Sequence, residues 1–244
     1  MSLLVAALVL AQVGDSWDIQ FAEPFELDRA VTTIVLDPDT HGAETVAAMK
    51  ARGVRVLCYV SVGALEDWRA DAGAFPDHVV GKALPDWEGE RYLDIRQQDV
   101  LLPIMAARFE ACRAAGYDGI DPDNIDGFAN DSGFDLSATD TVAYLAELAG
   151  VAHGMELIIG QKNAPELAGA LAGTLDFVIA ESCWQYGFCG DFAAYTEAGK
   201  PTFDIEYTDA GTDFTAACAG AKAKGISMIL KDRELSGAVY EACE

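Results

Sequence analysis

Three aspartates fall within the short segment GIDPDNIDG, which spans residues 119–127. Asp121, Asp123 and Asp126 are crowded enough to repel one another unless water, a cation or a cationic ligand relieves the repulsion. In an extended strand Asp121 and Asp123 share one face with Gly119, whereas Asp126 has the other parity. We therefore expect Asp121 and Asp123 to face a site, and Asp126 to brace the loop that follows.

Carboxylates also stand at the ends of other segments rich in β-formers, among them Asp37, Glu181 and Glu206. Paired carboxyl groups are the usual machinery of glycoside hydrolysis, with one ionised as nucleophile or base and the other protonated as acid. We expect Asp123 and Glu181 to form this catalytic pair, and Glu206 is the rival of Glu181 as the acid.

Other catalytic motifs are missing from the sequence. It has no GxSxG elbow, no P-loop, and no Ser or Cys beside a plausible catalytic histidine. An EF-hand loop framed on Gly127 fails because Pro122 takes its first ligand position. A divalent cation held by Asp121, Asp123 and Glu181 stays open as an alternative, but we expect neither a metal nor another cofactor.

Aromatic and polar side chains near the same strand ends are candidates for substrate binding. Trp184 and Tyr186 follow Glu181 directly, and sugar rings stack their apolar faces on such side chains. For Trp184 the alternative is a packing role over the strands. Further candidates, as hydrogen-bond donors or acceptors for hydroxyl groups, are Tyr59, Asn124, Lys162 and Asn163. For Lys162 the alternative is an ion pair that keeps a carboxylate ionised.

The chain is strongly acidic. Its 244 residues include 40 acidic and 16 basic ones, which gives a formal net charge of −24. Nucleic-acid binding is excluded as a function because phosphate backbones require a basic surface. The charge serves either solubility, through self-repulsion, or an acidic groove for a cationic ligand.

The N-terminal segment is apolar. Residues 1–12 contain an uninterrupted apolar run that is too short to span a bilayer. The run has the character of a secretory signal without its basic start, so the segment is either a signal-peptide remnant or a buried N-terminal segment. We expect a hydrolase domain over 13–244, no membrane span, a monomer, and secretion to the periplasm or the extracellular space.

Six cysteines permit three disulfides. Cys183 and Cys189 are close enough for a local bridge, Cys218 and Cys243 could fasten the C-terminus, and Cys58 with Cys112 remains as the third pair. Buried free thiols in a cytosolic protein are the alternative. A zinc site is not expected, because there is no CxxC pair and the three histidines are far apart in sequence.

Short β-rich runs alternate with helical segments along the whole chain. We predict strands at 17–21, 32–37, 54–61, 117–124, 156–163, 176–182, 201–207 and 226–232. We predict helices at 42–52, 97–115, 138–153, 164–173, 190–198, 211–224 and 233–243. Such alternation indicates an α/β fold with a parallel sheet covered by helices, and eight units of this length fit a single (β/α)8 TIM barrel. An open doubly wound sheet is the alternative, but the first strand lacks the Gly-rich turn that would follow it there.

The barrel also determines where the site lies. Catalytic groups of this fold sit at the carboxyl ends of the strands and in the loops that follow. The longest such loop, residues 62–96, is rich in Trp, Gly, Pro and charged residues. We expect it to be irregular and to form part of the binding cleft.

The chain resembles glycoside hydrolase family 114, the endo-α-1,4-polygalactosaminidase-like barrels. The resemblance runs from about Trp17 to Asp209 and is most specific in the combination of DPDNIDG with ESCWQYGFC. It also includes Trp17 with Gln20 and the segments YVSVGALEDWRAD, FPDHVVGKALPDWEGERYLDIR, GQKNAPEL and GKPTFDIEYTD.

This resemblance implies a secreted barrel that cuts α-1,4 linkages in galactosamine-containing polysaccharide, with retention and without metal. It implies Asp123 as the nucleophile and Glu181 as the acid/base. The substrate would be a cationic or partly N-acetylated polymer, whose ammonium groups Asp37, Asp121 and Glu206 could receive. A non-catalytic carbohydrate-binding barrel and a metal-dependent hydrolase are the alternatives.

Overall fold

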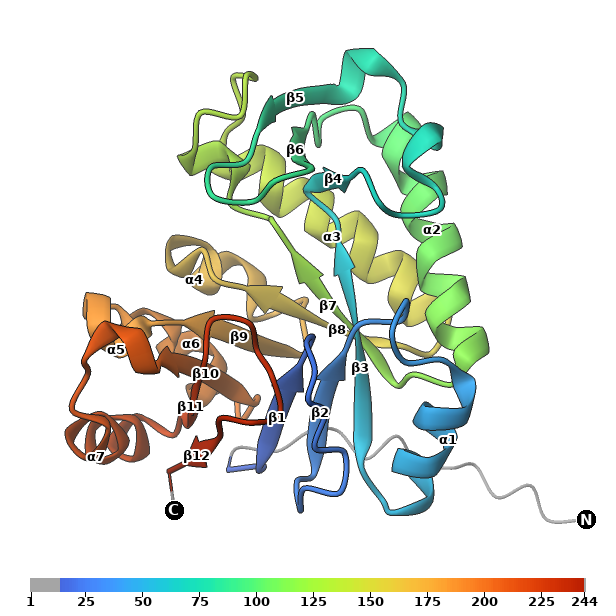
Figure 1. The fold of residues 1–244 in the computed structure, drawn as a ribbon. Helices are drawn as coiled ribbons and strands as arrows, with labels where there is room; N and C mark the ends of the chain where they lie inside the picture. Colours follow the sequence, from blue (N-terminus) through green and yellow to red (C-terminus); the bar gives the residue numbers. More distant parts are fainter. Residues whose placement is uncertain (1–13, 244) are drawn as a thin grey trace, which may run out of the picture.

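The computed structural model describes residues 14–243, so the expected signal or N-terminal segment 1–12 lies outside the described residues. Within that range, eight parallel strands curl into a barrel (Figure 1). Their bounds are β1 (Trp17–Gln20), β2 (Thr33–Leu36), β3 (Arg55–Ser61), β7 (Gly119–Asp123), β8 (Ile158–Lys162), β9 (Phe177–Glu181), β10 (Thr202–Tyr207) and β11 (Ser227–Lys231). They neighbour one another in this order, which confirms the predicted α/β barrel and each predicted strand.

The barrel is joined at a seam between β1 and β11. Just beyond these strands, Ala22 and Ser236 form a parallel bridge. Within the seam, Nζ of Lys231 lies 2.8 Å from Oδ1 of Asp18, and both side chains are fully buried. The bridge and the buried ion pair bring the two ends of the curled sheet together, which contradicts the open doubly wound alternative.

Helices cover the outside of the barrel (Figure 1). Their bounds are α1 (Ala43–Ala51), α2 (Gln98–Ala115), α3 (Ala138–Gly154), α4 (Ala168–Leu171), α5 (Cys183–Tyr186), α6 (Ala193–Glu197) and α7 (Phe214–Lys224). Short 3-10 helices, η4 (Pro165–Leu167) and η5 (Cys189–Phe192), precede α4 and α6. No helix of the described residues has the length and apolar composition that crossing a membrane requires.

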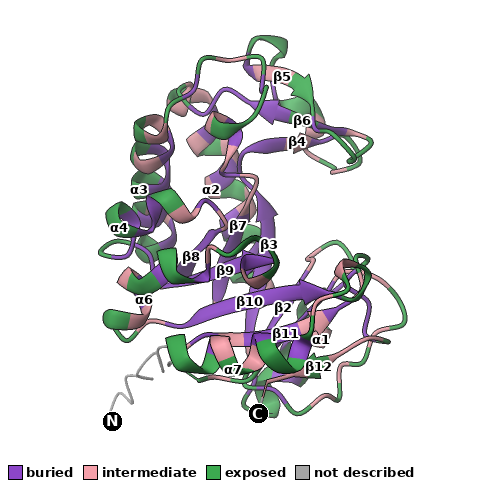
Figure 2. Cartoon of the chain, turned by 90° about the vertical axis from the view of Figure 1, so that its left-hand side faces the viewer, coloured by how far each residue is buried: buried purple, intermediate pink, exposed green. Residues whose placement is uncertain are grey.

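Two apolar layers hold the barrel together, one inside its lumen and one between strands and helices. The strands of the barrel are largely buried, whereas the helices also carry exposed residues (Figure 2). Along β7, Gly119 faces the lumen, where an added Cβ would lie 2.4 Å from Cγ1 of Ile158. Ile120 belongs to the outer layer. Because side chains alternate along a strand, Asp121 and Asp123 face the lumen with Gly119, as predicted. The small residue leaves room for the large apolar side chains that fill the barrel below the site.

Residues 62–96 form a small antiparallel sheet in place of the irregular loop that we expected. The sheet has the order β4-β6-β5, built from β4 (Ala64–Glu66), β5 (Val80–Ala83) and β6 (Glu90–Leu93). It stands over the carboxyl ends of β3 and β7 (Figure 1). The pairing buries Ala64, Leu84 and Tyr92 in an apolar cluster of their own, which stabilises the insertion as a separate layer.

The helix predicted over 233–243 does not form. Leu235 has a left-handed backbone with φ 52°, which a helix cannot contain. The segment instead contains β12 (Glu241–Ala242), which pairs antiparallel with β11 through Ile229 and Ala242. Pairing with the barrel edge supplies the backbone hydrogen bonds that a last helix would have made.

All three predicted disulfides are confirmed. Cys58–Cys112 joins β3 to α2, Cys183–Cys189 closes the loop around α5, and Cys218–Cys243 fastens the end of the described chain to α7. The alternative of buried free thiols is therefore wrong for this protein.

Candidate active site

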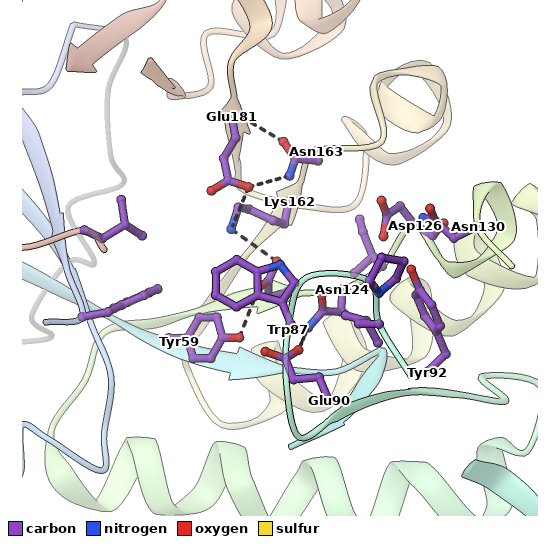
Figure 3. A pocket seen from close by; sticks show the side chains of 16 residues that line it. Tyr59, Trp87, Glu90, Tyr92, Asn124, Asp126, Asn130, Lys162, Asn163 and Glu181 are labelled. Carbon is purple, nitrogen blue, oxygen red and sulfur yellow. Dashed lines mark hydrogen bonds and ion pairs between the residues drawn. The ribbon is translucent and has the colours of Figure 1, made fainter. Parts of the chain in front are cut away.

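A cleft of about 350 Å³ lies between the carboxyl ends of the strands and the small antiparallel sheet (Figure 3). Asp123 at the end of β7, Lys162 at the end of β8 and Glu181 at the end of β9 line it together. Parallel strands end at the same rim of a barrel, so residues far apart in sequence converge there. The two carboxylates proposed from the sequence thus share one cleft.

The ammonium group of Lys162 lies between these two carboxylates. Its Nζ is 3.3 Å from Oδ1 of Asp123 and 3.8 Å from Oε2 of Glu181, and the residue is only 3 % exposed. Burial works against the charged form, but Asp123, Glu181 and Asp121 outweigh it and raise the pKa of Lys162 well above its usual range. The side chain of Lys162 is therefore a permanent cation. It forms ion pairs with Asp123 and Glu181, as the alternative interpretation of Lys162 predicted.

Glu181 is held by donors on three sides. The hydroxyl of Tyr207 donates to its Oε1 at 2.5 Å, and Nδ2 of Asn163 donates to its Oε2 at 3.0 Å. Burial raises the pKa of Glu181, but Lys162, Tyr207 and Asn163 together outweigh burial and lower it below its ordinary value. At neutral pH Glu181 is consequently ionised.

Asp123 is oriented by Tyr59 from the neighbouring strand β3. The Tyr59 hydroxyl donates to Oδ2 of Asp123 at 3.1 Å, while Lys162 contacts the other oxygen. Burial and the charge of Asp123 raise the pKa of Tyr59, so the phenol keeps its proton and remains a donor. Both oxygens of Asp123 are thereby held in place in a partly exposed carboxylate that lines the cleft.

Asp121 lies beneath this group and does not reach the cleft. It is fully buried, and neither carboxyl oxygen has a hydrogen-bond partner within the described residues. Burial raises the pKa of Asp121 to about 7, although Lys162 opposes that shift. The expectation that Asp121 receives a substrate ammonium group is contradicted. Asp121 precedes Asp123 by two residues on the same face of β7, so it lies deeper in the barrel, below the floor of the cleft.

The raised pKa of Asp121 predicts a pH-dependent cost to folding. The folded state binds the Asp121 proton more tightly than the unfolded state, so stability falls as pH rises from the ordinary pKa of 3.8 to about 7. The resulting loss in the free energy of unfolding is roughly 4 kcal/mol at most. We expect Asp121→Asn to gain stability relative to the parent by up to that amount between about pH 4 and about pH 8, measured by urea unfolding.

The exposed Asp77→Asn variant is the control and should follow the parent at both pH values. If the Asp121→Asn and parent stabilities change in parallel with pH, Asp121 titrates at its ordinary pKa and the interpretation is wrong.

Asp37 is occupied by an arginine. Its two oxygens accept hydrogen bonds from Nη1 and Nη2 of Arg69, each at 2.8 Å, and it does not line the cleft. A carboxylate bound by both arms of a guanidinium already has its cation. The expectation that Asp37 binds substrate is therefore contradicted.

Glu206 and Trp184 also lie outside the cleft. Glu206 is fully buried and accepts the backbone N–H of Trp184 at 2.8 Å, so it fastens the start of α5. The Trp184 ring packs on α7, where a Cβ on Gly220 would lie 2.0 Å from it. Glu206 sits on the outer face of β10 because Ile205 and Tyr207 face the lumen. Glu206 therefore lies outside the cleft that Glu181 lines, and Trp184 has the packing role.

The cleft continues past Glu181 into a second hollow of about 620 Å³. Tyr186, which is 70 % exposed, lines this second hollow rather than the first. Asp126 lines both hollows, and its carboxyl group also contacts Asn130 of the loop that we expected it to brace. An elongated ligand could thus contact Glu181 in the middle of a continuous surface.

Several cleft residues were not singled out in the sequence. Trp87, Glu90 and Tyr92 come from the insertion 62–96 (Figure 3). Tyr207 comes from the end of β10 and lines the second hollow. Asn124, which was expected, lines the cleft and donates from Nδ2 to Oε2 of Glu90 at 3.2 Å. The aromatic content of residues 62–96 predicted that this segment forms a wall of the cleft. No spacing of its residues indicated which side chains would line the cleft. Tyr207 lies two residues after Ile205, so it faces the lumen as Ile205 does. This alternation is the only sequence signal that could have identified Tyr207.

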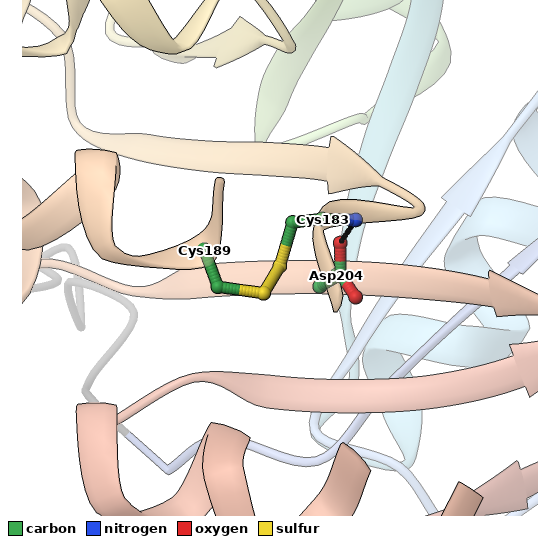
Figure 4. A group of neighbouring side chains, drawn as sticks. All are labelled: Cys183, Cys189 and Asp204. Atoms are coloured by element: carbon green, nitrogen blue, oxygen red, sulfur yellow. Dashed lines mark hydrogen bonds between the residues drawn. A yellow bond between two sulfur atoms is a disulfide. The ribbon is translucent and has the colours of Figure 1, made fainter. Parts of the chain in front are cut away.

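One group of side chains in the described part of the chain is spaced like metal ligands, namely Cys183, Cys189 and Asp204 (Figure 4). Its two sulfurs are joined in a disulfide, and Asp204 accepts the N–H of Cys183 at 3.1 Å. The group therefore braces the loop that follows Glu181. A divalent cation between Asp123 and Glu181 does not fit either, because the Lys162 ammonium contacts both carboxylates there.

Comparison with known proteins gives a consistent result. The crystal structure of Aspergillus fumigatus Ega3 in complex with galactosamine is similar to this chain with a TM-score of 0.89 and 30 % identity, covering 99 % of this chain and 100 % of that one. The glycoside hydrolase domain of PelA from Pseudomonas aeruginosa shares the fold, with a TM-score of 0.71 and 17 % identity over 93 % of this chain and 98 % of that one.

The match extends over the sequence as well. An uncharacterized protein of Deinococcus radiodurans is 27 % identical over 241 residues, which covers 87 % of this chain and 74 % of that protein. The model of the glycoside-hydrolase family GH114 matches residues 5–244. Because this match spans nearly the whole chain, the protein belongs to glycoside-hydrolase family GH114.

Proposed function

We propose that this glycoside hydrolase cleaves α-1,4-linked galactosamine-containing polysaccharide with retention of configuration, using Asp123 as nucleophile and Glu181 as acid/base. The observation that carries the proposal is the pair of carboxylates held on either side of Lys162 in one cleft. The similarity to Ega3, which was crystallised with galactosamine, supports the choice of sugar.

The reaction follows from the two carboxylates. Asp123 attacks the anomeric carbon while the bond to the leaving oxygen breaks, and Glu181 gives that oxygen its proton. Glu181, now ionised, then takes a proton from water, and the water oxygen displaces Asp123 from the anomeric carbon. In the first step only the protonated fraction of Glu181 can act, because its surroundings favour the ionised form. The same surroundings favour the base that the second step requires.

The spacing of the carboxylates supports retention. One Nζ atom contacts an oxygen of Asp123 at 3.3 Å and an oxygen of Glu181 at 3.8 Å, so these oxygens are separated by no more than the sum of the two distances. Retaining enzymes place their carboxyl groups about 5–5.5 Å apart, whereas inverting enzymes need about 6.5–9.5 Å to admit a water molecule. The bound admits the separation that retention requires.

Lys162 supports a mechanism without a metal ion. A metal ion would act here by neutralising carboxylates and developing charge. Lys162 already supplies a positive charge between Asp123 and Glu181 and is held by both. We therefore expect activity to survive exhaustive chelation.

Charge supports a cationic substrate. The chain carries a formal net charge of −24, and the cleft is lined by the carboxylates of Asp123, Asp126, Glu90 and Glu181 with Lys162 as a cation among them. An acidic cleft raises the local concentration of a cationic polymer and speeds its association. Deacetylated galactosamine units carry such positive charge.

The three disulfides support a secreted protein, since such bonds persist in oxidising compartments. We propose that the protein acts as a monomer, with Asp123, Lys162 and Glu181 supplied by the same chain.

The function is tested by incubating the protein with α-1,4-linked galactosamine polymers, deacetylated and N-acetylated, and identifying the products by mass spectrometry. Shorter oligosaccharides are expected, also in the presence of EDTA, and NMR should show the α-anomer as the first product. A polymer that is bound but not shortened would make the protein a carbohydrate-binding barrel, and a first product of β-configuration would make it an inverting enzyme.

Trp87 provides a prediction on substrate binding. It is 60 % exposed and lines both hollows of the cleft, where a sugar ring can stack on it. We expect Trp87→Ala to raise KM about tenfold with kcat nearly unchanged, because stacking favours substrate and transition state alike. Trp68 of the same insertion is 52 % exposed and lines neither hollow, so Trp68→Ala should behave like the parent. A loss confined to kcat would contradict the stacking role.

A further inference from the structure

A cation lies over the ring of Tyr207, the residue whose hydroxyl donates to Glu181. Arg233 follows β11, and its guanidinium carbon is 3.9 Å from the centre of the Tyr207 ring. A positive charge at this distance is attracted to the face of an aromatic ring. Nε of Arg233 also lies 3.0 Å from each oxygen of Asp209, two residues after Tyr207. Two interactions therefore attach Arg233 to the end of β10.

The side chain of Tyr207 is almost fully enclosed. It is 4 % exposed, although Tyr207 and Arg233 both line the second hollow beside Glu181. Tyr207 follows Ile205 on the lumen face of β10, and the guanidinium group of Arg233 covers one face of its ring. A tyrosine side chain turns about only two bonds, so a ring that is held in place also fixes the direction of its hydroxyl.

Arg233 acts through its charge as well as its position. Burial and the charge of Glu181 raise the pKa of Tyr207, so the phenol keeps its proton, and Arg233 opposes this rise. A cation over the ring thus makes the hydroxyl a stronger donor. Burial raises the pKa of Glu181, whereas Lys162, Tyr207, Asn163 and Arg233 lower it, in that order of size. The direct effect of Arg233 on Glu181 is the weakest of these four, and Tyr207 carries the larger one.

Other ionisable groups surround the same residues. Those that share the second hollow or lie close to Glu181 are Asp86, Asp121, Asp123, Asp126, Glu166, Tyr186 and Glu234. They can also titrate, so the effect of Arg233 is measured as a difference between variants that keep all of them.

We propose that Arg233 is a positioning residue for the acid/base, which it serves by holding the hydroxyl of Tyr207 on Glu181. The inference rests on the proposed function for the role of Glu181. The hydrogen bond from Tyr207 favours ionised Glu181, the form that takes a proton from water in the second step of the reaction. Without Arg233 the hydroxyl is held less firmly, so Glu181 keeps its proton to higher pH.

The test compares Arg233→Gln with Arg113→Gln. The two arginine side chains are 48 % and 49 % exposed, and each forms an ion pair with a partly exposed carboxylate. Arg113 lies on α2 and lines neither hollow. In the parent, kcat/KM should decrease from acid toward neutral pH. The ratio of kcat/KM at neutral pH to its value at the acid plateau should rise about threefold to tenfold in Arg233→Gln and stay unchanged in Arg113→Gln.

Two further variants identify the route of the effect. Arg233→Lys keeps a cation over the ring without the planar stack, so its ratio should lie between those of the parent and Arg233→Gln. Tyr207→Phe keeps the ring but removes the hydroxyl, so its ratio should also rise, and adding Arg233→Gln should then change it by less than about twofold. If Arg233→Gln has its full effect in Tyr207→Phe, or if it raises KM with the ratio unchanged, the inference is overturned.

A titration separates this inference from the proposed reaction. In protein labelled with ¹³C at the glutamate carboxyl groups, NMR identifies Glu181 by the signal that Glu181→Gln lacks. This signal should show Glu181 taking up its proton at higher pH in Arg233→Gln than in the parent or in Arg113→Gln. If the parent cleaves no galactosamine polymer, the proposed function fails, and the titration still decides the role of Arg233. A Glu181 that titrates at the same pH in the parent and in Arg233→Gln would contradict that role.

Discussion

Asp123→Asn lowers kcat on galactosamine polymer by about a thousandfold or more, with little change in stability. Asparagine cannot form the ester to the anomeric carbon through a carboxylate oxygen, so the covalent step is lost. It still accepts the hydrogen bond from Tyr59, and the side chain is partly exposed, so the packing around it is kept. Steady-state kinetics together with thermal unfolding measure both effects.

The control for this variant is Asp135→Asn, an exposed aspartate in the same loop between β7 and α3. It should match the parent in kcat and in melting temperature. An Asp123→Asn protein that keeps more than about a tenth of the parental kcat would show that another group is the nucleophile.

Glu181→Gln is expected to lower kcat/KM on the polymer by about a hundredfold to ten-thousandfold. The amide has no proton to give to the leaving oxygen and cannot activate water afterwards. A substrate with an aryl leaving group needs little protonation, so its first step should be nearly spared. Added azide should then restore turnover and give the α-glycosyl azide, because it attacks the ester without a base.

The pH profile gives a second measurement of the same role. Tyr207, Asn163 and Lys162 lower the pKa of Glu181, so the protonated fraction of this group falls as pH rises through and above that pKa. For the parent, kcat/KM should therefore decrease from acid toward neutral pH, and the Glu181→Gln variant should lose this dependence.

Glu206→Gln distinguishes Glu181 from its rival. Glu206 is fully buried and accepts the N–H that begins α5, so its replacement should lower the melting temperature and spare the chemical step. If Glu206→Gln shows the azide rescue and Glu181→Gln does not, the acid/base assignment is wrong.

Local sequence patterns determined much of this protein. Alternation of strands and helices predicted the barrel, and the period of two placed Gly119, Asp121 and Asp123 on one face. These patterns depend on backbone geometry within a few residues, so they can be read without the rest of the chain. The short spacing of Cys183 and Cys189 is likewise local, and their disulfide forms. The prediction of a final helix at 233–243 was wrong. Part of this segment pairs as β12 with β11, so its backbone hydrogen bonds go to a strand that local patterns do not reveal.

Alternation could not decide which face of a strand meets the lumen, since both faces of a barrel strand are buried. In β10 this left Glu206 as a candidate, whereas Tyr207 reaches Glu181. The alternation of side chains also could not predict how deep a residue lies along the barrel axis. This depth places Asp121 below the floor of the cleft and Asp123 within the cleft.

What only the tertiary structure decided is which charges meet. Arg69 forms ion pairs with Asp37 and Glu66, and Lys162 lies between Asp123 and Glu181. The sequence supplies the strand ends and their carboxylates, because these follow from local periodicity. The partners come from other strands and from the insertion, and electrostatic interactions depend on distance in space rather than separation along the chain.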